Sequence, residues 1–284
     1  DLYEEIARVY GYDNINPTDT FNSSFSTIQS DENMINKYLS NILSMNGFNE
    51  HYSNSLLSEK ENLLFSRGMD VEIANPLSLD MKHLRNSMIP GLINAVAFNM
   101  NHGNKDFKLF EVGEVHKKIK AKKENRYVQN SVLGLAWCCL GKKDWKDQSI
   151  FDIFDVKGEI NYIFNLLGVP IDFKYENQLL NIMSNKKKIG YITTIQNINS
   201  KLLKSDSNIF FSELHIDIIN NLQSKTKILM PSQYPTIERD ISILISKNIS
   251  YNQISDNIYN SGGELLKEIS LFDLYLDNKI DNDK

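Results

Sequence analysis

A turn, a helix and a buried strand follow one another within residues 75–115, NPLSLDMKHLRNSMIPGLINAVAFNMNHGNKDFKLFEVGEV. Asn75-Pro76 is a turn dipeptide, and Pro90 can occupy the first turn of a helix because no backbone N–H is needed there. Apolar residues then recur at helical spacing as far as Met100. Residues 107–112 are apolar on both faces, which is typical of a strand in the middle of a sheet. This stretch therefore predicts a central strand covered by a helix.

One residue of the predicted strand, Glu111, conflicts with its apolar surroundings. A carboxylate inside a buried strand is costly in free energy unless a cation or hydrogen-bond donors pair with it. Arg85, just before the predicted helix, is the candidate partner. We therefore expect a structural ion pair between Arg85 and Glu111.

Length and charge limit the class of protein. A chain of 284 residues is too long for one small core, so we expect two domains or one large domain with an appendage. The net charge of −5 argues against a surface that binds nucleic acid everywhere, although a local basic patch is compatible with it. The chain starts on Asp and ends in IDNDK, which suggests a segment of a longer protein.

The chain has two cysteines, Cys138 and Cys139, adjacent in an apolar run. Neighbours on a strand point to opposite faces, so we expect two buried thiols and neither a disulfide nor a metal pair. A reducing, cytoplasmic setting fits this pattern.

Three carboxylates, Asp1, Glu4 and Glu5, gather at the start of a helix predicted for residues 1–10 and closed by Gly11. One interpretation is electrostatic, with Asp1 as the N-cap and acids near the positive end of the helix dipole. The other is a Mg²⁺ site, because Mg²⁺ takes oxygen ligands and often uses one or two carboxylates plus water. Spacing alone favours the first interpretation.

The remaining elements define a fold class. A helix over residues 31–45, begun by Ser30 or Asp31, leads into a strand over residues 48–56. Other expected elements are strands over residues 131–140, 171–175, 189–195 and 210–216, and a helix that Asp155 caps and Gly168 closes. Strands mixed with isolated helices and hairpin-length links predict an α+β fold with an antiparallel sheet and not a doubly wound one.

Two basic runs, residues 116–126 (HKKIKAKKENR) and residues 186–188, have no aromatic residue within them. We interpret both as solvated hairpin tips in preference to phosphate-tracking patches.

Motifs of independent catalysis are absent from the sequence. It contains no GxxxxGK[ST] loop and no GxGxxG after a strand. Its five histidines show no HExxH spacing, and its two cysteines show no CxxC spacing. Phosphate-loop and zinc chemistry are therefore not expected.

Four stretches carry a family resemblance. LRNSMIPGLINAVAFNMN with LFEVGEV resembles the core of the bacterial-type phenylalanyl-tRNA synthetase beta subunit, and so does FDIFDVKGEINYIFNLLG after Trp145. DLYEEIARVYGYDNI is similar to the end of the family's B5 domain. The C-terminal order of strand, helix and strand, with YP, RD and LFDLY in place, resembles the first half of its ferredoxin-like anticodon-binding domain.

The resemblance implies an antiparallel class II aminoacyl-tRNA synthetase-like core, catalytic-like but inactive, followed by a truncated ferredoxin-like anticodon-binding domain. It implies the end of B5 over residues 1–20, the core over residues 21–230 and half of the anticodon-binding domain over residues 231–284. Between residues 177 and 217 this chain lacks the two His-Pro segments usual in the family, so no role is carried over from those positions.

The functional implications also follow from the resemblance. The chain would dock the catalytic alpha subunit through the helix over residues 30–45 and the neighbouring strand, in an alpha2beta2 heterotetramer that binds tRNA(Phe) and uses ATP. Mg²⁺ would be bound by Asp1, Glu4 and Glu5, shared with the alpha subunit and completed by a ligand upstream. Two alternatives stay open: a self-sufficient Mg²⁺ enzyme for phosphoryl chemistry, and a stand-alone scaffold or RNA-binding paralogue without ligase activity.

Overall fold

The computed structural model describes residues 1–20, 34–65, 70–119, 126–141, 145, 149–194, 196, 209–222, 234–246 and 248–275. The chain divides into two compact units, Asp1–Thr226 and Lys227–Lys284. The expected boundaries near residues 20 and 230, and the expected cap at Ser30 or Asp31, lie at or within segments outside the described residues.

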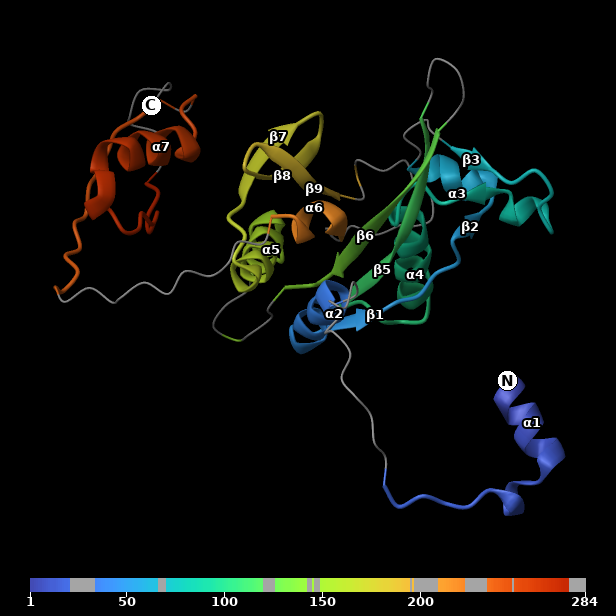
Figure 1. Ribbon diagram of the computed structural model, residues 1–284. Coiled ribbons are helices and arrows are strands. Elements are labelled where there is room, and N and C mark those ends of the chain that lie inside the picture. Colours follow the sequence, from blue (N-terminus) through green and yellow to red (C-terminus); the bar gives the residue numbers. More distant parts are fainter. Residues whose placement is uncertain are drawn as a thin grey trace. The chain divides into compact units, whose positions relative to one another are not determined.

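A seven-stranded sheet forms the centre of the first unit, with strand order β1-β5-β6-β10-β9-β8-β7 (Figure 1). Its strands are β1 (Phe48–Glu50), β5 (Phe107–Ile119), β6 (Arg126–Cys138), β7 (Asp172–Glu176), β8 (Leu179–Ser184), β9 (Lys187–Thr194) and β10 (Ile209–His215). Every neighbouring pair is antiparallel except β1 and β5, which run parallel. The sheet is thus mixed and not wholly antiparallel as expected, because the long connection between β1 and β5 supplies the crossover that a parallel pair requires.

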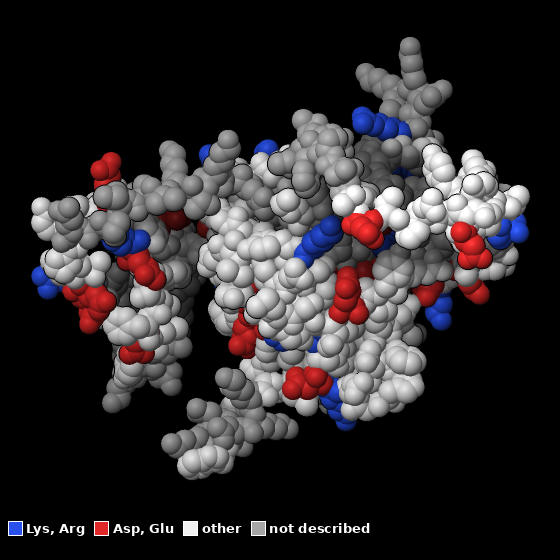
Figure 2. Space-filling model, turned by 60° about the horizontal axis from the view of Figure 1, so that its bottom comes forward, with Lys and Arg blue, Asp and Glu red and all other residues white. Residues whose placement is uncertain are grey.

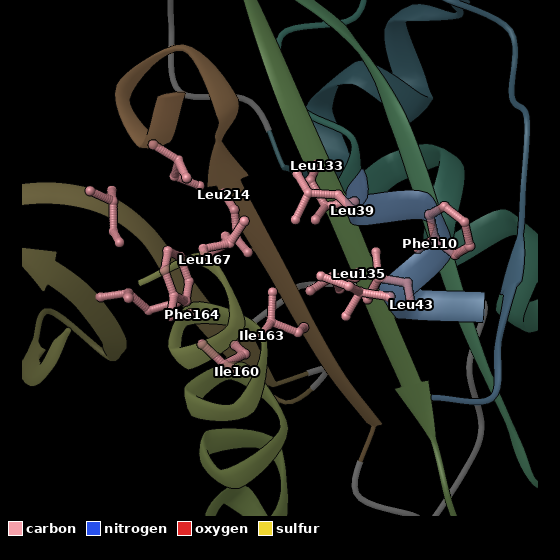
Figure 3. Packing of buried hydrophobic residues seen from close by; sticks show 14 of the residues in the cluster. Leu39, Leu43, Phe110, Leu133, Leu135, Ile160, Ile163, Phe164, Leu167 and Leu214 are labelled. Carbon is pink, nitrogen blue, oxygen red and sulfur yellow. The ribbon is translucent and has the colours of Figure 1, made fainter. Parts of the chain in front are cut away.

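Helices cover both faces of this sheet. Helix α4 (Ile89–Asn101) packs on one face, and α2 (Met34–Met45), α5 (Ile153–Leu167) and α6 (Ile216–Asn220) pack on the other. Alternate residues of β6 serve the two sides, since Ala136 belongs to the α4 side and Leu135 to the α2 and α5 side. Figure 3 shows leucine, isoleucine and phenylalanine side chains of the second core between α2, β5, β6, β10 and α5.

A second, three-stranded sheet joins β2 (Leu56–Leu57), β4 (His83–Leu84) and β3 (Val71–Glu72) beside helix α3 (Glu59–Leu64). The single strand expected over residues 48–56 was wrong, because it is divided between the two sheets. The reason is local hydrogen bonding between the two sheets: the N–H of Ser53 donates to the Glu111 side chain and not to a neighbouring strand, and the N–H of Leu56 donates to the Asn54 side chain where β2 begins.

Helix α5 begins one turn earlier than expected. Asp152 is its N-cap, and Asp155 is the third helical residue, so the assignment of the cap to Asp155 was wrong. The two aspartates form a reciprocal capping box in which each side chain accepts a backbone N–H of the other. Gly168, at φ 67°, closes the helix in the left-handed conformation, as expected.

The basic tip at residues 186–188 is part of a hairpin. Asn185 and Lys186 have φ of 48° and 64° and form the two-residue turn between β8 and β9. Asn177 and Gln178 form a similar turn between β7 and β8. Strand β8 was not predicted from the sequence. Lys187 and Lys188 lie in β9 itself.

The N-terminal and C-terminal segments contain short helices. Helix α1 (Leu2–Tyr10) ends at Gly11, whose φ is 92°, and a 3-10 turn η1 (Tyr12–Asn14) follows. The second unit contains α7 (Tyr251–Gly262) and η4 (Gly263–Leu265). The strands expected on both sides of α7 are not formed within residues 234–246 and 248–275, where no residue is buried. A strand without a partner and without buried contacts has little to stabilise it.

The helices within the described ranges are all too short or too polar to cross the apolar interior of a bilayer.

The adjacent cysteines lie on opposite sides of the sheet, as predicted. Cys138 is buried in the α4 core, but Cys139 is only partly buried against the other core, so the expectation of two buried thiols was wrong for Cys139. Both are free thiols. Burial raises the pKa of Cys138 to about 11 and that of Cys139 to about 12.

We expect these thiols to react slowly in the native chain. At pH 8 a thiol with a pKa of about 11 holds about 100-fold less thiolate than one with a pKa of 9, and thiolate is the reactive form. Titration with a coloured thiol reagent should show little reaction before denaturation and two equivalents after it. Rapid modification of the native chain would contradict this expectation.

Candidate functional site

A buried polar network lies beneath the first turn of α4, on the segment that carries the strongest sequence signal. Residues 85–88 (RNSM) and the start of α4 are buried without interruption. Two glycines make this possible, because a Cβ at Gly134 would lie 2.7 Å from the Cβ of Met88, and one at Gly113 would lie 2.1 Å from Nη2 of Arg85. The segment therefore rests directly on bare backbone of β5 and β6.

The structure brings Arg85 and Glu111 together. Nη1 of Arg85 donates to Oε1 of Glu111 at 2.6 Å, and their side chains are only 7% and 0% exposed. The same guanidinium donates through Nε to the carbonyl oxygen of Glu114 at 2.8 Å and through Nη1 to Oγ of Ser53 at 3.1 Å. Ser53 completes the network by donating its N–H and its hydroxyl to the Glu111 carboxylate. Both charges are thus hydrogen-bonded on several sides, which a buried ion pair requires.

A second buried carboxylate, Glu213 on β10, holds the other end of the same segment. It accepts hydrogen bonds from the N–H of Met88 at 2.5 Å, from Oγ of Ser87 at 2.6 Å and from the hydroxyl of Tyr191. The negative charge also lies at the N-terminus of α4, where the helix dipole favours it.

Sequence reasoning missed Glu213, although the signal was present. It sits in the apolar run NIFFSELHI, and its alternation with Ile209 and Phe211 places it on the buried face. Like Glu111, it is a carboxylate within an apolar strand and therefore needs a buried partner.

The two carboxylates and Arg85 hold residues 85–88 in place, and their hydrogen-bonding groups are engaged within this network and not available to a substrate. Binding a phosphate on this face of the sheet would require a cation that is free to contact it. The guanidinium of Arg85 is not free, because Glu111 already neutralises it. Helix α4 and residues 85–88 occupy the surface where a pocket would have to open.

A shallow hollow of about 140 Å³ lies where α2, β1 and α5 meet, lined by Asn46, Phe48, Gly158, Glu159, Tyr162 and Ile163. Glu159 is engaged by Lys108 and by Nε1 of Trp137 at 2.8 Å. Sites for small-molecule ligands typically measure about 300–1,000 Å³. This hollow is therefore too small for a nucleotide.

The predicted metal ligands lie on α1. Asp1 is the N-cap but its side chain caps no backbone N–H, and Glu5 pairs with Arg8 at 2.5 Å. Among the residues that the structure describes, no three His, Cys, Asp or Glu side chains gather as a metal site. Asp1, Glu4 and Glu5 therefore do not fit a Mg²⁺ site by themselves.

Helix α2, the expected docking element, buries Ile35, Leu39, Ile42 and Leu43 in the core of its own domain. Its exposed large apolar residues are Met34 (65% exposed) and Met45 (87%) at its ends and Tyr38 (44%) between them. Packing on its own sheet thus accounts for most of its apolar stripe, and the two methionines remain on the surface.

Comparisons with known proteins agree with this architecture. Residues 17–216 match the family model described as phenylalanyl tRNA synthetase beta chain CLM domain, and residues 232–284 match that of a ferredoxin-fold anticodon binding domain. A phenylalanine–tRNA ligase beta subunit of Francisella tularensis is 30% identical over 97% of this chain and 35% of its own length. One of Legionella pneumophila is 29% identical over 100% of this chain and 37% of its own length.

The chain therefore spans about a third of the length of these curated relatives. Among solved structures, a pyrrolysyl tRNA synthetase of Desulfitobacterium hafniense aligns with a TM-score of 0.50 and 11% identity, covering 66% of this chain and 67% of its own. At that identity the likeness concerns the fold alone.

Proposed function

Because the chain belongs to the phenylalanyl-tRNA synthetase beta chain family, we propose that it is a non-catalytic portion of the beta subunit of phenylalanine–tRNA ligase. In this proposal it docks the catalytic alpha subunit and contacts tRNA while the assembled enzyme joins phenylalanine to tRNA(Phe) at the expense of ATP.

One observation carries the non-catalytic part of the proposal. Both faces of the central sheet are covered by helices of the chain itself, and the buried arginine of the α4 face is paired with Glu111. Catalysis of adenylate formation requires preorganised cations aimed at phosphate charge. The arginine buried under helix α4 is neutralised by Glu111, so this covered face of the sheet suits the docking of another subunit better than it suits an ATP site.

The partner and the tRNA contacts follow from the family. We assign the alpha-subunit contact to the exposed end of α2 around Met45 and to strand β1, within an alpha2beta2 heterotetramer in the cytoplasm. We assign contact with the anticodon to residues 231–284, residues 1–20 to the end of a preceding domain and residues 21–230 to the core. The two family models support this division, since they match residues 17–216 and 232–284.

Magnesium enters the proposal only through shared ligands. Since Asp1, Glu4 and Glu5 do not form a site by themselves and Glu5 is paired with Arg8, other ligands would have to complete it. Oxygen ligands of this kind suit Mg²⁺, which would serve the ATP-dependent step of the assembled enzyme.

Mixing this chain with the alpha subunit tests the proposal. Light scattering should detect a stable species that contains both chains, and ATP–pyrophosphate exchange should stay at background for this chain alone and appear only with the alpha subunit. Exchange catalysed by this chain alone would contradict the proposal in favour of a self-sufficient enzyme. Failure to associate would favour a stand-alone scaffold.

A further inference from the structure

Strands β5 and β6 extend beyond the rest of the sheet as a two-stranded ribbon. Each has 13 residues, but β1 pairs only with residues 108–110 of β5, and β10 pairs only with residues 132–138 of β6. Their outer parts, residues 114–119 and 126–131, pair with each other and with no other strand among the described residues. We call these two segments the β5–β6 ribbon. Figure 1 shows the two long arrows running past their neighbours.

The ribbon carries cations and an exposed aromatic side chain. Its basic residues are Lys117, Lys118 and Arg126, and Tyr127 is 61% exposed. In the strand register Lys118 lies opposite Tyr127, so these two side chains share one face. Arg126 lies on the other face.

These cations have no ion-pair partner within the described part of the chain. Several basic residues elsewhere are paired, since Arg8, Lys82, Arg85, Lys108 and Lys174 each contact a carboxylate. Glu114 is the one acidic residue of the ribbon, and it lies at the base, opposite Ser131.

The charge of the ribbon contrasts with that of the rest of the molecule. Residues 116–126 contain five lysines and one arginine against one glutamate, in a chain whose net charge is −5. On the face shown in Figure 2, acidic and basic side chains are interspersed. Such a local concentration of positive charge points to a polyanionic partner.

We propose that the β5–β6 ribbon binds RNA, with Lys117, Lys118 and Arg126 on the phosphate backbone and Tyr127 stacked on an unpaired base. Cations alone would suit any polyanion, but an exposed aromatic ring beside a lysine is the combination that single-stranded nucleic acid selects. The proposal rests on the function proposed above, because the tRNA bound by the assembled ligase is the RNA within reach. It places one tRNA contact on the core of the chain, separate from the C-terminal unit.

The test uses the full-length beta subunit assembled with the alpha subunit, and fluorescence anisotropy with labelled tRNA(Phe). Changing Lys118→Ser together with Arg126→Ser should weaken tRNA binding by about tenfold. It should also reduce the magnitude of the slope of log K against log salt by about two, because binding releases about one counterion fewer for each phosphate contact that is lost. Tyr127→Ser should weaken binding about tenfold with little change in that slope, since stacking is not ionic.

The matched control is Lys174→Ser with Lys187→Ser, which removes the same charge from strands β7 and β9 at the other side of the sheet. Its binding should change by less than about twofold. Equal behaviour of the ribbon and control variants would overturn the inference. If a double variant fails to assemble, the single variants Lys118→Gln and Arg126→Gln carry the same comparison.

Two outcomes separate the inference from the function on which it rests. A wild-type complex that neither binds nor charges tRNA(Phe) would contradict the proposed function. A wild-type complex that binds it, with ribbon variants that bind equally well, would contradict the ribbon alone. The inference would also be overturned if the ribbon variants bound poly-glutamate more weakly than the wild-type complex but bound tRNA(Phe) equally well. The ribbon would then be assigned to an acidic protein partner.

Discussion

Replacing Arg85 with alanine is expected to reduce the free energy of unfolding by about 3–5 kcal/mol. The substitution leaves the Glu111 carboxylate, whose side chain is 0% exposed, without a counter-charge. The hydroxyl and N–H of Ser53 would remain as donors, but they do not neutralise a buried charge. Urea denaturation followed by the fluorescence of Trp137, which is buried in the core, measures the effect.

Two further variants make this expectation specific. Because a buried ion pair often contributes no more than well-packed apolar residues, Arg85→Met combined with Glu111→Leu should recover most of the loss. Lys82→Ala breaks a partly exposed pair with Glu72 at the surface and should cost about 0–1 kcal/mol. An Arg85→Ala variant as stable as the Lys82→Ala variant would refute the structural role given to the pair.

The second large effect concerns Glu213. Its replacement with alanine should cost about 3 kcal/mol or more, because it leaves three buried donors without an acceptor, each at about 1–3 kcal/mol. These donors are the N–H of Met88 and the hydroxyls of Ser87 and Tyr191. Hydrogen exchange at the first turn of α4 should rise together with the loss of stability.

Conservative variants separate hydrogen bonding from packing at this position. Glu213→Gln keeps an oxygen for Met88 and Ser87 and should cost about 1 kcal/mol, and Tyr191→Phe removes one donor and should cost a similar amount. A Glu213→Ala variant no less stable than Tyr191→Phe would show that the carboxylate does not hold the segment.

The elements best predicted from sequence were those with a local physical cause. Gly11 and Gly168 end helices because both have a positive φ, which suits glycine, and Arg85 meets Glu111 because a carboxylate in an apolar strand needs a partner. The assignment of the α5 cap to Asp155 was wrong, because Asp152 and Asp155 both fit the pattern of a cap and only the hydrogen bonds distinguish them.

Features that depend on distant neighbours could not be predicted in this way. The period of apolar residues defines β1 and β5 as strands but says nothing about which strand lies beside which, so their parallel pairing was not foreseen. Helical spacing likewise groups Asp1, Glu4 and Glu5, but a metal site also needs ligands from elsewhere, which spacing within one helix cannot reveal.

The two carboxylates that hold residues 85–88 come from strands on opposite sides of β6. Sliding α4 by one turn, about 5.4 Å, would separate both acids from their donors at once, whereas purely apolar contacts would tolerate such a shift more easily. The network therefore allows α4 only one alignment along the sheet. The positions of the residues that pack around α4 are fixed with it.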